Sequence, residues 1–138
     1  MTENYNIDDF INVKSPVKEK NVDFKRFPVP FKIRSLTAKE MADLRKESKT
    51  VEFNSRTHLK QSVFDQDKFE DKLMVASVVV PNLTDEKLQK HYGTYGDPAG
   101  TLEAMLLAGE YNVLADKVME LSGVAADSDT DLVKEAKN

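Results

Sequence analysis

The chain contains no cysteine, which excludes disulfides, zinc sites built on thiolates, and thiol nucleophiles. It also lacks an excess of basic residues, because 20 Lys and Arg stand against 24 Asp and Glu, a net charge of -4. Phosphate binding needs clustered Lys and Arg, so nucleic acid is not expected as the main partner.

Long apolar runs are missing as well. The longest one, from Met74 to Val80, is interrupted by Ser77 and is too short to span a bilayer. The first residues, MTENYNIDDF, have neither the basic start nor the apolar stretch of a secretory signal. We therefore expect a soluble, intracellular protein with no membrane partner.

Patterns that carry catalysis or bind metals are also scarce. The two histidines, His58 and His91, have no second ligand at helical spacing and no base–nucleophile pattern around them. The acidic stretch from Asp65 resembles a calcium loop, but Glu70 and Ala76 stand where that loop needs glycine and glutamate. The glycines of GTYGDPAG miss the spacings of phosphate-binding loops. We expect no enzymatic activity, no metal and no cofactor.

What the chain does contain suits one soluble domain. It has 138 residues, of which 40% are hydrophobic and 32% charged, a globular balance that can supply a core. The polar N-terminus predicts a flexible arm over residues 1–20. A single α+β domain should follow over residues 21–123. The small and charged residues 124–138 predict a disordered tail.

The N-terminal half of the domain carries strand signals. NVDFKR and FKIRSL each alternate apolar and polar residues on either side of Pro28 and Pro30, which predicts a β-hairpin. TVEFNS and HLKQSVF predict a second hairpin, with Asn54-Ser55 as turn residues. Between the hairpins, Thr37 and Glu40 have the spacing of a capping box, so a helix should run to about Lys46.

The C-terminal half predicts about four short helices. The first follows the apolar spacing from Phe69, although the valines at 78–80 favour a strand and leave its end open. Thr84 is the expected cap of the second helix, and Gly93 its end. Asp97-Pro98 should begin the third. The residues expected to be buried are Phe69, Leu73, Leu88, Leu102, Leu106, Leu114 and Val118.

A corner is predicted at Gly109. The apolar stripe of Leu102 and Leu106 is out of phase with the stripe that begins at Tyr111, which favours two helices over one. Glu110 then falls in the first turn of the second helix, where its charge is favourable. If Gly109 ends the earlier helix in a left-handed conformation, alanine there should destabilise the protein.

The same half resembles the XkdN-like family of phage tail assembly chaperones. The resemblance rests mainly on the order and spacing of five short motifs, and with the looser agreement of FKIRSLTAKE and DLRK in the first half it covers roughly residues 20–123. Ala108 stands where the family pattern leads us to expect proline. The motifs are Pro81-Asn82-Leu83, Leu88-Gln89, Tyr92-Gly93, Met105-Leu106-Leu107 and Gly109-Glu110-Tyr111.

The resemblance implies a protein that binds the tape measure protein, keeps it soluble and helps recruit tail tube subunits. Such a protein works in the host bacterial cytoplasm and is absent from the mature virion. Self-association stays open, as do two alternatives, a structural tail or connector subunit retained in the virion and a host-directed adaptor. The ending Ala136-Lys137-Asn138 allows a slippery codon run, so we also expect a minor product extended by a -1 frameshift.

Four residues that flank the shared turns are the expected partner contacts: Leu83, Leu88, Tyr92 and Tyr111. Tyrosines around an irregular connection suit a partner surface, because each joins an apolar ring to a polar hydroxyl. The competing interpretation is that these side chains only pack the helix junctions.

Overall fold

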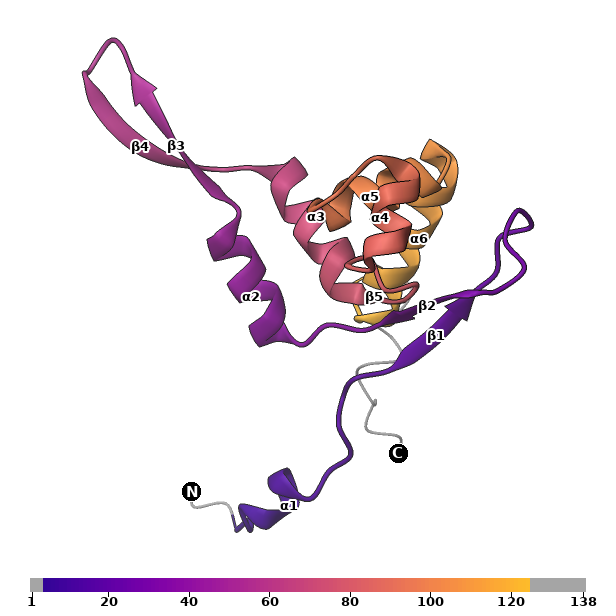
Figure 1. Cartoon of the computed structure of the whole chain (residues 1–138). Coiled ribbons are helices and arrows are strands. Elements are labelled where there is room, and N and C mark those ends of the chain that lie inside the picture. Colours follow the sequence, from indigo (N-terminus) through magenta and orange to yellow (C-terminus); the bar gives the residue numbers. More distant parts are fainter. Residues whose placement is uncertain (1–3, 125–138) are drawn as a thin grey trace.

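A computed structural model describes residues 4–124, so the predicted tail beyond Val124 and the frameshift position lie outside the described residues. Strand hairpins come first and helices follow, which confirms the α+β prediction (Figure 1). The elements are α1 (Asp8–Ile11), β1 (Glu19–Val22), β2 (Phe31–Arg34), α2 (Ala38–Glu47), β3 (Lys49–Asn54), β4 (Leu59–Phe64), α3 (Gln66–Ser77), β5 (Val78–Val80), α4 (Glu86–Tyr92), α5 (Pro98–Met105) and α6 (Ala108–Leu121).

Strands β1 and β2 form the first hairpin, and β5 pairs with β2 to complete a three-stranded antiparallel sheet in the order β1-β2-β5. Strand β1 ends at Val22, earlier than the alternation through Arg26 predicted. Phe24 is nevertheless buried, because it leaves the strand and packs its ring edge-on against Phe31 at 5.4 Å. The valines at 78–80 form β5, so the strand preference decides the end of the preceding helix.

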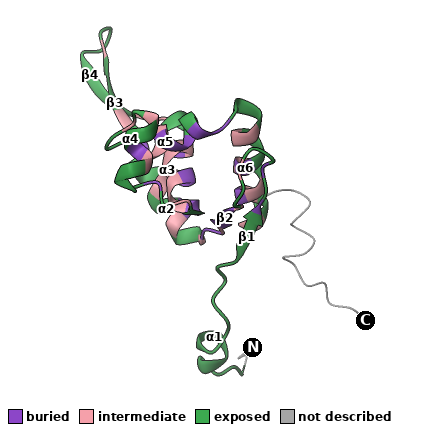
Figure 2. Ribbon diagram, turned by 45° about the vertical axis from the view of Figure 1, so that its right-hand side comes forward, coloured by how far each residue is buried: buried purple, intermediate pink, exposed green. Residues whose placement is uncertain are grey.

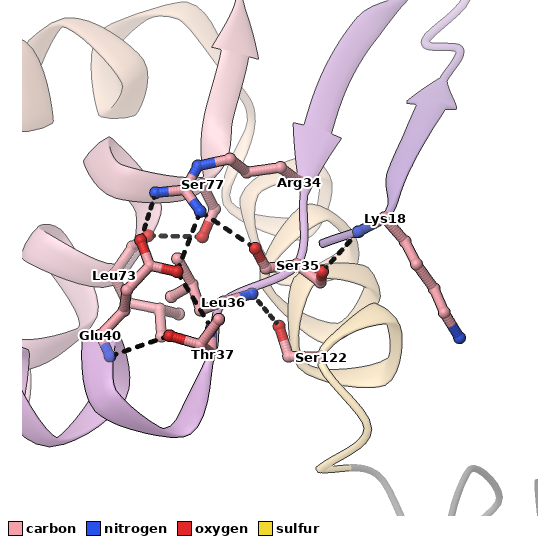
Figure 3. A network of polar contacts seen from close by, with 9 residues as sticks. All are labelled: Lys18, Arg34, Ser35, Leu36, Thr37, Glu40, Leu73, Ser77 and Ser122. Atoms are coloured by element: carbon pink, nitrogen blue, oxygen red, sulfur yellow. Dashed lines mark hydrogen bonds and ion pairs between the residues drawn. The ribbon is translucent and has the colours of Figure 1, made fainter. Parts of the chain in front are cut away.

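The predicted capping box at the start of α2 is confirmed, and it belongs to a larger polar junction (Figure 3). The Glu40 amide donates to Thr37 Oγ1 at 3.2 Å, and the Thr37 amide donates to Glu40 Oε1 at 3.0 Å. Arg34 adds two hydrogen bonds to the Glu40 carboxylate, at 2.7 and 3.2 Å. The Arg34 guanidinium, followed by the Thr37 amide, lowers the pKa of Glu40 to about 2.

The same junction joins the segment before β1 and the end of α6 to the segment that follows β2. The Lys18 amide donates to Ser35 Oγ at 2.7 Å, and the Ser35 amide donates back to the Lys18 carbonyl at 2.8 Å. The Leu36 amide donates to Ser122 Oγ, just after α6, at 2.9 Å. These bonds fix where the N-terminal segment leaves the body and where α6 ends.

The second hairpin, β3–β4, is confirmed, and it projects away from the rest of the molecule (Figure 1). Its strands pair in regular register from Lys49↔Phe64 to Asn54↔Leu59. Phe64 connects its base to the body, because the Phe64 ring lies 5.6 Å from the ring of buried Phe69 in α3.

Helices α3 to α6 pack above the three-stranded sheet, and the core lies between their inner faces and the sheet (Figure 2). Six of the seven residues expected to be buried are buried, and Leu88 is half-buried against the same core. Within residues 4–124, no helix is long and apolar enough to cross a bilayer.

Three of these helices begin at an aspartate. Asp65, Asp85 and Asp97 each accept a hydrogen bond from the amide three residues later. The prediction that Thr84 caps α4 is therefore wrong by one residue. The Thr84 hydroxyl instead bonds Asn82 Oδ1 at 2.7 Å, which leaves the capping position to Asp85. The predicted end of α4 at Gly93 is confirmed by a left-handed φ of 67°.

The corner between α5 and α6 is confirmed, but it lies before Gly109. Helix α5 ends at Met105, Leu106 and Leu107 are extended, and α6 begins at Ala108. Gly109 therefore lies inside the first turn of α6, and it does not have the left-handed conformation that would make alanine costly there. The chain turns through two extended leucines, which needs no positive φ.

Candidate partner-binding surfaces

Glu110 stabilises the corner between α5 and α6. Its Oε1 accepts the Leu107 amide at 2.8 Å, which satisfies one of the free N–H groups at the start of α6. Arg26, from the loop between β1 and β2, reaches the same carboxylate at 2.6 Å and donates to the Met105 carbonyl at 2.8 Å. The Arg26 hydrogen bond and then the Leu107 amide lower the pKa of Glu110. Glu110 therefore has a structural role at this corner.

A cleft opens beside this corner, between α3, the end of α5 and the start of α6. Its volume is about 490 Å³. Acidic side chains line it together with Leu106 and Tyr111. The lining residues are Asp67, Glu70, Asp71, Glu103, Leu106, Ala108, Tyr111 and Asn112.

The cleft concentrates negative charge. A hydrogen bond to the Asp71 carboxyl is the largest influence on Glu103, and together with burial and neighbouring carboxylates it raises the pKa of Glu103 to about 6. Burial, followed by the charges of Glu70, Asp71 and Glu103, raises the pKa of the Tyr111 hydroxyl. The crowded carboxylates are unfavourable to one another, and a cationic side chain of a partner would relieve that repulsion.

These acids do not form a metal centre. Among the described residues, no group of three His, Cys, Asp or Glu side chains is placed to hold a metal ion. The arrangement is suited to contacts with a protein segment that combines apolar and basic side chains.

The four residues predicted as partner contacts lie in different environments. Leu83 is only 4% exposed and belongs to the core. Leu88 and Tyr92 on α4 are half-buried against that core, and the Tyr92 ring packs edge-on against His91. Tyr111 is also half-buried, and it is the one of the four that lines the cleft. Their role in binding a partner stays a prediction.

Two exposed apolar regions lie at the ends of the molecule, where Figure 2 is largely green. One is the β3–β4 hairpin, where Val51 and Phe53 are 70% and 62% exposed. The other is the N-terminal segment around α1, where Phe10 and Ile11 are 67% and 66% exposed. Alternation reveals a strand, but it does not show whether the apolar face has a neighbour that covers it.

Comparisons with known proteins agree with one another. A model of the phage XkdN-like tail assembly chaperone proteins matches residues 7–137. The phage-like element PBSX protein XkdN of Bacillus subtilis (strain 168) is 28% identical over 127 residues, covering 91% of this chain and 84% of that protein. The uncharacterized protein YqbN of the same strain is 29% identical over 127 residues, with coverages of 91% and 83%.

The fold has a counterpart among solved structures. A crystal structure of the protein YqbN superposes with a TM-score of 0.69 and 23% identity, covering 88% of this chain and 98% of that one. This likeness supports the fold, and the family match extends over most of the chain. The chain belongs to the phage XkdN-like tail assembly chaperone family.

Proposed function

We propose that this chain binds the tape measure protein during tail assembly, keeps it soluble and helps recruit tail tube subunits. Family membership supports a role in tail assembly, and the cleft at the α5–α6 corner is the observation that carries the binding proposal. A tape measure protein is long and helical, so it exposes apolar stripes before the tube covers them, which makes it prone to aggregate.

The cleft offers the chemistry to cover such a stripe. Leu106 and Tyr111 provide an apolar wall, and Glu70 and Glu103 provide acidic partners for Lys or Arg on the bound helix. Tyr111 is the principal contact in this proposal. Leu88 and Tyr92 are secondary contacts on α4, and Leu83 supports them from the core.

A copurification experiment with charge-reversed variants tests this site. Glu70→Lys with Glu103→Lys should abolish copurification with the cognate tape measure protein, because the variant repels the basic side chains that the cleft attracts. Asp23→Lys with Asp116→Lys is the matched control, since both residues are exposed, lie outside the cleft and give the same change in net charge. Equal copurification of the two variants would remove the cleft from the proposal.

The proposal also places the protein in the bacterial cytoplasm and outside the finished particle. Mass spectrometry of purified virions should then find the tube and tape measure proteins without this chain. Stoichiometric amounts of the chain in the particles would instead favour the alternative of a structural tail or connector subunit.

A further inference from the structure

The β3–β4 hairpin has one face that is both apolar and basic. In an antiparallel pair, directly opposite residues share a face, and alternate residues of each strand lie on it. The register therefore places Val51, Phe53 and Phe64 on the same face as Lys49 and Lys60. Glu52 and its partner Gln61 lie on the opposite face. We call the first of these the hairpin face.

The hairpin face is exposed along most of its length. Val51, Phe53 and Phe64 are 70%, 62% and 42% exposed. A two-stranded hairpin is marginally stable in water, and exposed apolar side chains in a row typically mark an interaction site. The face therefore has the composition of a surface that a further element covers.

Residues 5–13 of the N-terminal arm have matching chemistry. Its five apolar side chains are all more than 60% exposed, and Asp8 and Asp9 occupy the first turn of α1 between them. The rings of Tyr5 and Phe10 contact each other edge-on at 5.6 Å and form a small apolar cluster. The apolar residues are Tyr5, Ile7, Phe10, Ile11 and Val13.

We propose that the N-terminal arm of one copy packs on the hairpin face of a second copy. The two surfaces are complementary, because each presents apolar side chains and they carry opposite charges, Asp8 and Asp9 on the arm and Lys49 and Lys60 on the hairpin. The arm and the hairpin extend from opposite sides of the body, so the contact joins two molecules (Figure 1).

The contact is small and partly electrostatic. Because the interface is at the low end of the sizes seen between proteins, it should form only at high protein concentration. Because part of it is electrostatic, it should weaken as salt screens the charges. It needs no tape measure protein, and its test is therefore independent of the function proposed above.

Sedimentation equilibrium of the full chain, from micromolar to millimolar concentration, tests the contact with two double variants. Phe10→Ser with Ile11→Ser disables the arm, and Val51→Thr with Phe53→Thr disables the hairpin face while keeping residues that favour strands. All four side chains are exposed, so folding should be unaffected. The wild-type chain should associate, and each variant alone should remain monomeric.

The mixture of the two variants is the decisive sample. The hairpin variant still has an intact arm and the arm variant an intact hairpin face, so equimolar mixing should give a one-to-one heterodimer. Val29→Thr, at an exposed valine in the β1–β2 loop, is the control and should associate like the wild type. A monomeric wild type, variants that associate as well as the wild type, or a mixture that stays monomeric would each overturn the proposal.

Charge reversal tests the pairing separately. Asp8→Lys with Asp9→Lys, or Lys49→Glu with Lys60→Glu, should weaken association at low salt, and all four changes in one chain should restore it. An additive loss in the fourfold variant would show that these charges do not face one another.

Discussion

Replacing Gly109 by alanine should stabilise the protein, although a glycine at a helix corner suggests the opposite. Gly109 lies in the first turn of α6 without a positive φ, and a Cβ built on it meets no atom within 4 Å. Glycine in a helix costs about 0.5–1 kcal/mol relative to alanine, because it loses more backbone freedom on folding. The expected gain is of that size, or about 2–4 °C in Tm for a domain of this length.

Gly93 provides the matched control. A Cβ there also meets nothing within 4 Å, but Gly93 ends α4 with a φ of +67°. Gly93→Ala should therefore destabilise the protein by about 1 kcal/mol or more, because a side chain is strained in the left-handed region. The two substitutions make the same chemical change in equally open space, so backbone conformation alone should give them opposite signs.

Thermal and denaturant unfolding followed by circular dichroism would measure both variants. A loss of stability in Gly109→Ala, comparable to that in Gly93→Ala, would refute the reasoning. It would place the corner at a left-handed Gly109 and would contradict the extended turn at Leu106 and Leu107.

Two further predictions concern the cap of α2 and the acidic cleft. Thr37→Ala should lower the free energy of unfolding by about 1 kcal/mol, and Thr84→Ala should lower it less, because of these two hydroxyls only that of Thr37 caps a helix. Denaturant titration of both variants measures the difference, and an equal loss of stability would contradict the assigned caps. In the folded state the pKa of Glu103 is about 6, compared with an ordinary value of 4.5. Between pH 4.5 and 6 the folded state therefore binds more protons than the unfolded state, so the contribution of Glu103 to stability falls as the pH rises through this range. Asp71→Asn should lower the Glu103 pKa and reduce that pH dependence, which NMR titration and unfolding at several pH values would measure; an unchanged Glu103 pKa would contradict the assigned cause.

Local signals in the sequence predicted where α2 and α5 begin. The pair of Thr37 and Glu40, and the pair of Asp97 and Pro98, carry their capping geometry in a few adjacent residues, so no distant contact is needed to recognise them. Thr84 and Asp85 are adjacent and both can cap, and the choice depends on the hydrogen bond that Thr84 makes to Asn82. Such a competition is invisible in residue spacing.

The corner between α5 and α6 shows what the hydrophobic periodicity of the sequence does not predict. Two stripes out of phase indicate that a helix breaks between Leu106 and Tyr111, but they do not indicate which residues turn. Glu110 fixes the start of α6 by accepting the Leu107 amide, and its other partner, Arg26, is 84 residues away. Only the folded chain brings that guanidinium to the corner.

The candidate surfaces were harder to predict than the fold. Leu83 was expected at a surface because it flanks a shared turn, and the fold places it in the core. The cleft brings carboxylates from α3 and α5 next to the start of α6, and each carboxylate is an ordinary charged position within its own helix. The apolar residues of the hairpin are exposed because no other element within residues 4–124 covers β3–β4, which is a property of the packing and not of the strands.

The measurement that tests the proposed function most directly is the soluble yield of the cognate tape measure protein, expressed with and without this chain. The tape measure protein should be largely insoluble alone, and it should become soluble and copurify with the chain when both are present. A soluble fraction unchanged by the chain, with no copurification at low salt, would contradict the proposal that this family member binds and protects the tape measure protein.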